Sequence, residues 1–131
     1  MVKKLKNSGV CRGCNLSGIN LSGADLKGVD LNKANLSGAI LKEANLSRAN
    51  LSRAYLQTAN LQKEDLIRAH LERANLTRAN MSGANLSGAD LDGADLREAN
   101  LQGTNAIRGE IKLAILCHTK TPWGLDNSDC K

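Results

Sequence analysis

The sequence predicts an all-β solenoid, a chain that winds in short repeated units around a narrow apolar interior. Leucine recurs at every fifth position from 16 to 101, where 18 positions hold seventeen leucines and Met81. Alanine fills 14 of the 18 positions two residues before this leucine, and asparagine or aspartate fills 15 of the 18 positions one residue before it. The two residues after the leucine are almost all polar or glycine.

A period of five fits neither standard element. On an α-helix successive leucines would step round by roughly 140° and cover no single face. On an extended strand they would alternate between the two faces, because side chains there have a period of two. A chain that bends after each short extended piece buries every leucine, since each coil then covers the apolar face of the last. Small residues beside each leucine suit a densely packed interior.

The tandem motif A-(D/N)-L-x-x, as in Ala34-Asn35-Leu36-Ser37-Gly38, closely resembles the pentapeptide-repeat family. The resemblance implies a right-handed quadrilateral β-helix, with four pentapeptides per coil, a β-turn at each corner, and the leucine and small residue pointing inward. Degenerate pentads continue over 104–118 and predict a little over five coils, about 25 Å long. They keep the leucine phase at Ala106, Ile111 and Leu116, and the small-residue phase at Gly109 and Ala114.

Three segments are expected along the chain. Residues 1–10 form an N-terminal capping segment, in which Val2 and Leu5 are spaced for one face of a short helix. Residues 11–118 form the β-helix, and residues 119–131 form a C-terminal cap. The last coil needs a lid because its unpaired backbone groups would otherwise pair with another strand. The side chains expected to provide this lid are Pro122, Trp123 and Leu125.

Four cysteines lie in pairs at the two ends of the predicted rod. Cys11 and Cys14 belong to a segment similar to C-x-G-C-(D/N)-L-S-G. Cys117 and Cys130 belong to a terminus similar to C-x-T-x-x-P-x-G…N-S-x-C. Both segments resemble those of cyanobacterial-type members of the family. The terminus has one residue fewer than that pattern between glycine and asparagine, and Trp123 where an acidic residue is common.

We expect the disulfide bonds Cys11–Cys14 and Cys117–Cys130. The second would close a loop of about 14 residues and contribute roughly 3 kcal/mol. One zinc site made of all four cysteines is excluded, because the pairs lie at opposite ends of the rod. Free thiols, and redox or metal chemistry at Cys11 and Cys14, are the alternatives.

Basic residues gather in the middle of the predicted rod. Positions about 20 residues apart stack in columns, which places Lys33, Arg53 and Arg73 in one column and Arg48 and Arg68 in the next. These columns are either solvated faces screened by salt or a surface for an acidic partner. Nucleic acid is disfavoured because no aromatic residues are interleaved and the net charge of +5 is modest. The segment 82–100 is acidic, so the rod is dipolar.

Four residues depart from the repeat. Glu64 replaces an inward alanine, while Ile40, Tyr55 and His70 replace the outward asparagine or aspartate. Burying an unpaired carboxylate costs several kcal/mol, so we expect a local bulge that carries Glu64 to solvent. The alternative is a buried functional carboxylate, with His70 as its nearest candidate partner. Ile40, Tyr55 and His70 are expected to be surface substitutions.

The function predicted is a non-enzymatic structural or protein-interaction module, with no cofactor and an unidentified protein partner. An enzyme needs converging polar groups, whereas the interior here is leucine and the chain has only two histidines, His70 and His118. The family's gyrase-protecting members mimic the negative charge of DNA, which a basic chain does not. A basic surface for nucleic acid or another anionic partner is the other alternative.

The sequence also gives expectations for the compartment and the oligomeric state of the protein. The sequence has no apolar run of about 18 residues that would span a membrane, and its first ten residues lack the apolar core of a signal peptide. The expected compartment is therefore the cytoplasm, although disulfide bonds favour an oxidising space such as the periplasm or thylakoid lumen. A monomer is favoured over a dimer.

Overall fold

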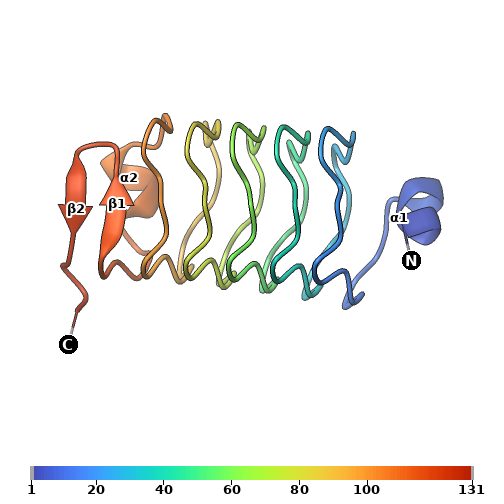
Figure 1. Ribbon diagram of the computed structural model, residues 1–131, viewed down its shortest axis with the longest axis horizontal. Coiled ribbons are helices and arrows are strands. Elements are labelled where there is room, and N and C mark those ends of the chain that lie inside the picture. The colour runs from blue at the N-terminus through green and yellow to red at the C-terminus, as the bar shows by residue number, and fades with distance from the viewer. Residues whose placement is uncertain (1, 131) are drawn as a thin grey trace.

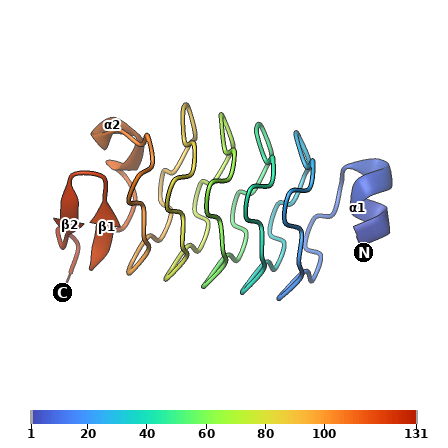
Figure 2. The ribbon, with the colours of Figure 1, turned by 45° about the horizontal axis from the view of Figure 1, so that its top comes forward.

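The protein, described for residues 2–130 by a computed structural model, is a right-handed quadrilateral β-helix. Figure 1 shows a rod of stacked coils with a helix at the N-terminal end and a hairpin at the C-terminal end, and the turned view of Figure 2 shows the coils running parallel to one another. The named elements are α1 (Val2–Ser8), α2 (Arg108–Ile111), β1 (Thr119–Thr121) and β2 (Gly124–Asp126). None of the helices in the described part of the chain is long and apolar enough to cross a membrane.

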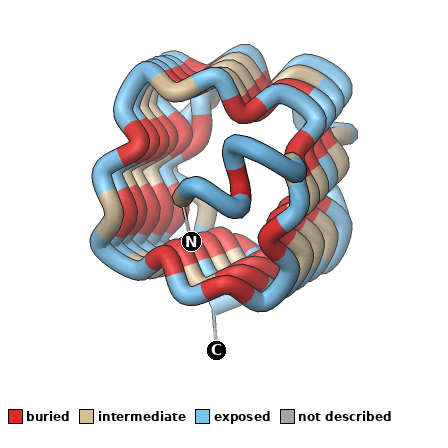
Figure 3. Tube along the Cα trace, turned by 90° about the vertical axis from the view of Figure 1, so that its right-hand side faces the viewer, coloured by how far each residue is buried: buried red, intermediate tan, exposed pale blue. Residues whose placement is uncertain are grey.

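Each coil contains four pentads. Parallel bridges join residues 20 apart, from the Val10–Asp30 pair to the Asn100–Lys120 pair. Viewed end-on, the chain traces four sides (Figure 3). The two residues after each leucine make the turn at a corner, as at Leu31, whose carbonyl accepts a 2.9 Å hydrogen bond from the Ala34 N–H. The extended part of each side is therefore too short to form a long strand.

Leucine and alanine side chains fill the interior. From Leu31 to Leu101 every residue in the leucine phase is at most 1% exposed. The alanine two residues earlier is buried beside it, in a narrow space that suits a small side chain. Leu5 of α1 is completely buried and closes the N-terminal end.

The residue before each leucine explains the preference for asparagine and aspartate. Its side-chain oxygen accepts a hydrogen bond from the backbone N–H two residues later. Examples are Asn35 with the Ser37 N–H at 3.0 Å and Asp65 with the Ile67 N–H at 3.0 Å. Such a bond satisfies a turn donor that the ladder leaves free. Ile40 and Tyr55 offer no oxygen for this purpose.

The bulge expected at Glu64 is wrong. Glu64 is 1% exposed, and its carbonyl accepts a 2.9 Å hydrogen bond from the Asn85 N–H, so the ladder continues through this pentad. The side chain takes its place in the inward column between Ala44 and Ala84, whose small side chains leave room for it. Neither carboxyl oxygen has a hydrogen-bond partner among the described residues. Burial, with a smaller contribution from the charge of Asp65, raises the pKa of Glu64 well above its ordinary value, which favours the neutral acid.

The last pentads keep only part of the repeat geometry. Ala106, Ile111 and Leu116 are buried as predicted, but α2 replaces a regular side and carries Gly109 to the surface. Glu110 holds this helix in place, because its carboxylate accepts hydrogen bonds from the Ile107 N–H at 3.0 Å and from the Gly88 N–H of the previous coil at 2.9 Å. An acidic residue that bridges two coils therefore replaces the corner turn.

A hairpin forms the C-terminal cap. β1 extends the stack through the Asn100–Lys120 bridge, and β2 pairs with β1 in antiparallel register. Trp123 packs partly against the core, but Leu125 is 63% exposed, so the expectation that Leu125 covers the last coil is wrong. The backbone of β2, more than its side chains, covers the end. Both predicted disulfide bonds, Cys11–Cys14 and Cys117–Cys130, are present.

Candidate interaction surface

The corner positions organise the charged surface. The second corner residue of each regular pentad has a positive φ, which glycine adopts readily and other residues at some cost. In the middle coils this position is often basic instead of glycine. We call Lys33, Arg53 and Arg73 the first ridge and Arg48 and Arg68 the second ridge; their φ angles lie between 56° and 62°.

The two ridges border one side of the rod. This side, the His70 face, has Asp30, Asn50, His70 and Asp90 as its stacked outward residues. The next side beyond the first ridge, the Tyr55 face, has Asn35, Tyr55, Asn75 and Asp95. All five ridge residues are exposed, and none forms an ion pair within the described part of the chain, where the pairs involve Arg12, His70, Arg78 and Arg97.

Glycine corners in the following coil accommodate the arginine stems. A Cβ atom on Gly93 would lie 3.1 Å from Cγ of Arg73, and one on Gly88 would lie 3.2 Å from Cγ of Arg68. The aliphatic parts of both arginines therefore lie over the bare glycine backbone of the next coil, which orders the stems while the guanidinium groups stay in water. Sequence reasoning found these arginines but missed how they are supported.

A carboxylate cluster lies on the His70 face and at the corner of the first ridge. Glu72 accepts a 2.7 Å hydrogen bond from the Ser52 hydroxyl and contacts His70 Nδ1 at 2.8 Å. Partial burial opposes ionisation of Glu72, but the hydrogen bonds from Ser52 and His70 outweigh it and lower its pKa. The Asp92 amide stabilises the Asp90 carboxylate, but desolvation and the neighbouring Glu72 outweigh this bond and raise the pKa of Asp90.

This cluster lacks the geometry of a catalytic triad. The Ser52 hydroxyl donates to the Glu72 carboxylate and not to the imidazole of His70, so no base is placed to activate the serine. Glu64 does not contribute, because it lies in the interior whereas His70 is on the surface. The cluster instead places carboxylates beside ridge cations, because Glu72 and Asp92 lie at the corner of the first ridge and Asp90 lies on the His70 face. The two columns of basic residues predicted from the sequence are the two ridges, and carboxylates accompany the first ridge.

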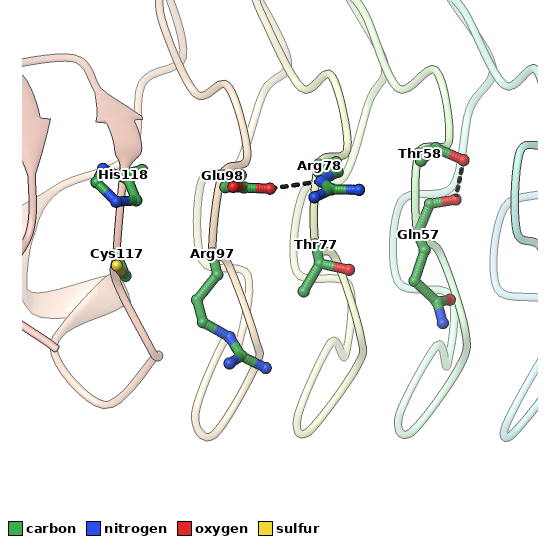
Figure 4. A pocket seen from close by; sticks show the side chains of 8 residues that line it. All are labelled: Gln57, Thr58, Thr77, Arg78, Arg97, Glu98, Cys117 and His118. Carbon is green, nitrogen blue, oxygen red and sulfur yellow. Dashed lines mark hydrogen bonds and ion pairs between the residues drawn. The ribbon is translucent and has the colours of Figure 1, made fainter. Parts of the chain in front are cut away.

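Figure 4 shows a groove along the corner on the far edge of the Tyr55 face. Its lining residues are Gln57, Thr58, Thr77, Arg78, Arg97, Glu98, Cys117 and His118. The cations here are paired: Arg78 Nε lies 2.5 Å from Glu98, and Arg97 binds both oxygens of Asp95. The hydrogen bond from Arg97 outweighs partial burial and lowers the pKa of Asp95. This corner therefore offers less free charge than the ridges.

Tyr55 and Ile40 are the two outward departures from the repeat that expose a large apolar side chain. Tyr55 is 50% exposed, against 38% for Ile40, and both give up the turn hydrogen bond that asparagine would make. His70 is exposed as well, as the sequence predicted. A residue that breaks a local rule without a packing gain is a candidate for function, and tyrosine is enriched among residues that dominate binding energy. Tyr55 lies immediately beyond the first ridge.

Comparison with known proteins agrees with the repeat geometry. A family model described as pentapeptide repeats matches the chain in eight copies, over residues 10–43, 49–88 and 65–103. The crystal structure of the pentapeptide repeat protein Rfr23 from the cyanobacterium Cyanothece 51142 is 35% identical, covers 92% of both chains and superposes with a TM-score of 0.79. No curated protein matches the chain.

Two other solved structures are more distant. A pentapeptide repeat protein from the thylakoid lumen of Arabidopsis thaliana is 32% identical over 74% of this chain and 72% of its own, with a TM-score of 0.47. A trypsin-treated form of QnrB1, a plasmid-mediated fluoroquinolone resistance protein, is 20% identical over 92% of this chain and 58% of its own, with a TM-score of 0.50. At that identity the likeness to QnrB1 concerns the fold alone.

Proposed function

This chain belongs to the pentapeptide-repeat family, and from that premise we propose that it is a non-enzymatic interaction module that binds an acidic segment of a partner protein. The observation that carries the proposal is the pair of ridges. Five exposed cations, none of them in an ion pair within residues 2–130, border the His70 face at positions fixed by the corner geometry. A surface that is already ordered loses little conformational entropy when it binds.

The arrangement favours an extended acidic segment over a polyanion with uniform charge. Asp90 on the His70 face, and Glu72 and Asp92 at the corner of the first ridge, repel a continuous negative backbone. A peptide carries separate acidic side chains, which can contact individual ridge cations without a continuous negative charge passing over these carboxylates. Tyr55, beyond the first ridge, provides an aromatic contact of the kind that often anchors protein interfaces. A DNA-mimic function is disfavoured because the net charge is +5.

The lack of a catalytic arrangement supports the non-enzymatic part of the proposal. Leucine and alanine fill the interior, so a catalytic site would have to lie on the outer surface. On that surface the hydroxyl of Ser52 and the ring of His70 both contact Glu72 instead of each other. The remaining histidine, His118, directly precedes β1 at the C-terminal end of the rod (Figure 4).

The test measures binding of a fluorescent glutamate- and aspartate-rich peptide by anisotropy at two salt concentrations. The double variant Arg53→Glu, Arg73→Glu is expected to bind at least about tenfold more weakly, a change of about 1.4 kcal/mol. The matched control is Lys42→Glu, Lys63→Glu, which makes the same change in net charge at a corner away from both ridges. It is expected to bind within about twofold of the wild type, since screened distant charges contribute little.

Two outcomes would contradict the proposal. Equal weakening of both double variants would show that net charge, and not the ridges, attracts the peptide. Tighter binding of a single-stranded oligonucleotide of equal charge, lost in Arg53→Glu, Arg73→Glu, would identify the ridges as a nucleic-acid surface instead.

A further inference from the structure

Three potential metal ligands meet at the C-terminal end of the rod. The side-chain sulfur atoms of Cys117 and Cys130 and a ring nitrogen of His118 all lie within 4.8 Å of one another. Figure 4 shows Cys117 and His118 together at the last corner of the groove, beside Glu98 of the preceding coil. Two thiolates and one imidazole are a donor set that suits zinc, which accepts sulfur and nitrogen ligands in tetrahedral geometry.

The backbone holds these residues together independently of the disulfide bond. The Leu116 N–H donates to the Asp129 carboxylate at 2.8 Å, and the Asp129 N–H donates to the Leu116 carbonyl at 2.8 Å. The Asn127 side chain accepts a 2.8 Å hydrogen bond from the His118 N–H. The pairing of β1 with β2 joins the same two segments. When the sulfur–sulfur bond is broken, these contacts still keep the two thiols and the imidazole close.

We propose that the reduced C-terminal cap binds one thiophilic divalent cation of the zinc class through Cys117, His118 and Cys130, with water as the fourth ligand. A dithiol reductant supplies two electrons and two protons to the disulfide and itself becomes a disulfide. Binding of the cation then releases both thiol protons, so the two thiolates balance its charge. The cation takes over the role of the bond, linking the end of the last coil to the segment after β2.

The N-terminal pair provides an internal comparison. Cys11 is 0% exposed and Cys14 is 8% exposed, in the first coil close to the buried Leu5 of α1, whereas Cys117 is half-buried and lines the groove of Figure 4. Among the described residues, no third cysteine, histidine, aspartate or glutamate joins Cys11 and Cys14 in a possible ligand group. A reductant therefore reaches the C-terminal pair more readily, and a metal is expected only there.

The experiment titrates Co²⁺, and then Zn²⁺, into the full chain after reduction with a phosphine and its removal without oxygen. The reduced wild type is expected to bind one cation per chain, with the intense visible absorption of tetrahedral cobalt and a thiolate charge-transfer band. Its midpoint of thermal unfolding, lowered by reduction, is expected to rise again with Zn²⁺. The oxidised wild type is expected to bind none.

Variants assign the ligands. In a Cys11→Ser, Cys14→Ser background, binding is expected to persist, and His118→Ala is expected to weaken it at least about tenfold. The reciprocal variant Cys117→Ser, Cys130→Ser, which keeps the N-terminal pair, is expected to show no cobalt spectrum. X-ray absorption on the zinc-loaded wild type is expected to show sulfur at about 2.3 Å and nitrogen at about 2.0 Å, a readout that does not depend on any variant folding. A reduced chain that binds no cation, or binding unaffected by His118→Ala, would overturn the proposal.

Discussion

At the scale of single residues, the side chain before each leucine determines whether a corner donor is satisfied. Asn75 accepts the Thr77 N–H at 3.1 Å, but Tyr55, in the same column, offers no oxygen to the N–H of Gln57. We expect Tyr55→Asn to raise the free energy of unfolding by about 1 kcal/mol, because it adds one hydrogen bond. Asn75→Ala, which removes one, is expected to lower it by a similar amount. Urea denaturation of both variants measures the two changes.

The same Tyr55→Asn variant separates stability from binding. If Tyr55 is retained for interaction, this variant is more stable than the wild type and yet binds the acidic peptide more weakly. A variant that is both more stable and equally tight would show that Tyr55 is an ordinary surface substitution. The sequence predicted that Tyr55 is an ordinary surface substitution, because the loss of the turn hydrogen bond is visible only once the backbone is known.

Glu64 is a second residue whose replacement should stabilise the protein. Its two carboxyl oxygens are buried without partners, and the adjoining inward residues Ala44 and Ala84 are small. Glu64→Met keeps a similar volume and removes the unsatisfied oxygens. We expect it to raise the free energy of unfolding by about 1–3 kcal/mol at neutral pH. A decrease in stability, measured by urea denaturation, would show that the carboxyl has a partner such as a buried water.

The raised pKa of Glu64 also predicts how stability depends on pH. Below the ordinary glutamate value of 4.5 the carboxyl is protonated in both folded and unfolded chains and has no differential effect. As the pH rises through that value the unfolded chain releases the proton while the folded chain keeps it. The free energy of unfolding therefore falls as the pH rises from the ordinary glutamate value to the raised pKa of Glu64. The stability difference between Glu64→Met and wild type is expected to grow over this pH range, and a constant difference would contradict it.

The repeat frame placed Glu64 inward, and the expectation of a bulge overrode that frame. The error lay in treating the cost of a buried charge as decisive, when a carboxyl group can take up a proton and the ladder around it stays intact. The five-residue period was thus sufficient to predict which residues face the interior. It was insufficient for protonation, which depends on how completely the carboxyl is buried, and for ion pairs such as Arg78–Glu98, which join neighbouring coils.

At the scale of elements, α1 acts as the plug of the first coil. Leu5 is completely buried, and the helix lies across the open end of the rod in Figure 3. We expect Leu5→Ala to lower the free energy of unfolding by about 2–5 kcal/mol, since it removes buried apolar contacts and leaves a cavity. The exposed Lys4→Ala serves as control and is expected to have little effect. Hydrogen exchange should show faster opening in the first coil of Leu5→Ala; unchanged exchange there would show that α1 is not a cap.

The two helices differ in how well the sequence predicts them. The spacing of Val2 and Leu5 predicted a short helix, and α1 spans Val2–Ser8. The helix α2 was missed, since leucine-phase residues continue through its segment, at Ala106 just before it and at Ile111 at its end. Its cause is Glu110, whose carboxylate accepts N–H groups from two different coils. That contact depends on stacking, which a local pattern does not contain.

At the scale of the whole molecule, the ridges form because each coil has 20 residues, so corner residues that are 20 apart stack on one another. The 20-residue coil suffices to predict that Arg53 stacks on Arg73, and the bridges Asn50–His70 and His70–Asp90 agree with it. The sequence alone did not indicate that Arg78 is paired with Glu98 while Arg53 and Arg73 have no ion pair within the described residues. The difference arises because the corner residue of the next coil is Arg73 for Arg53 and Gly93 for Arg73, whereas it is Glu98 for Arg78.

Deletion of whole coils tests whether the ridges act as a surface of a modular rod. Removal of residues 51–70 or of residues 76–95 joins an asparagine to a leucine in phase, so both shortened chains are expected to fold, because each coil contacts only its neighbours. The first deletion removes Arg53, Tyr55 and Arg68, and we expect it to abolish binding of the acidic peptide. The second keeps all five ridge residues but removes Gly88 and Gly93, which support the stems of Arg68 and Arg73, so we expect it to retain binding that is weaker than that of the wild type. Circular dichroism checks the fold of each deletion and anisotropy checks binding; loss of binding in the second, well-folded deletion would mean that the partner reads the length of the rod and not its ridges.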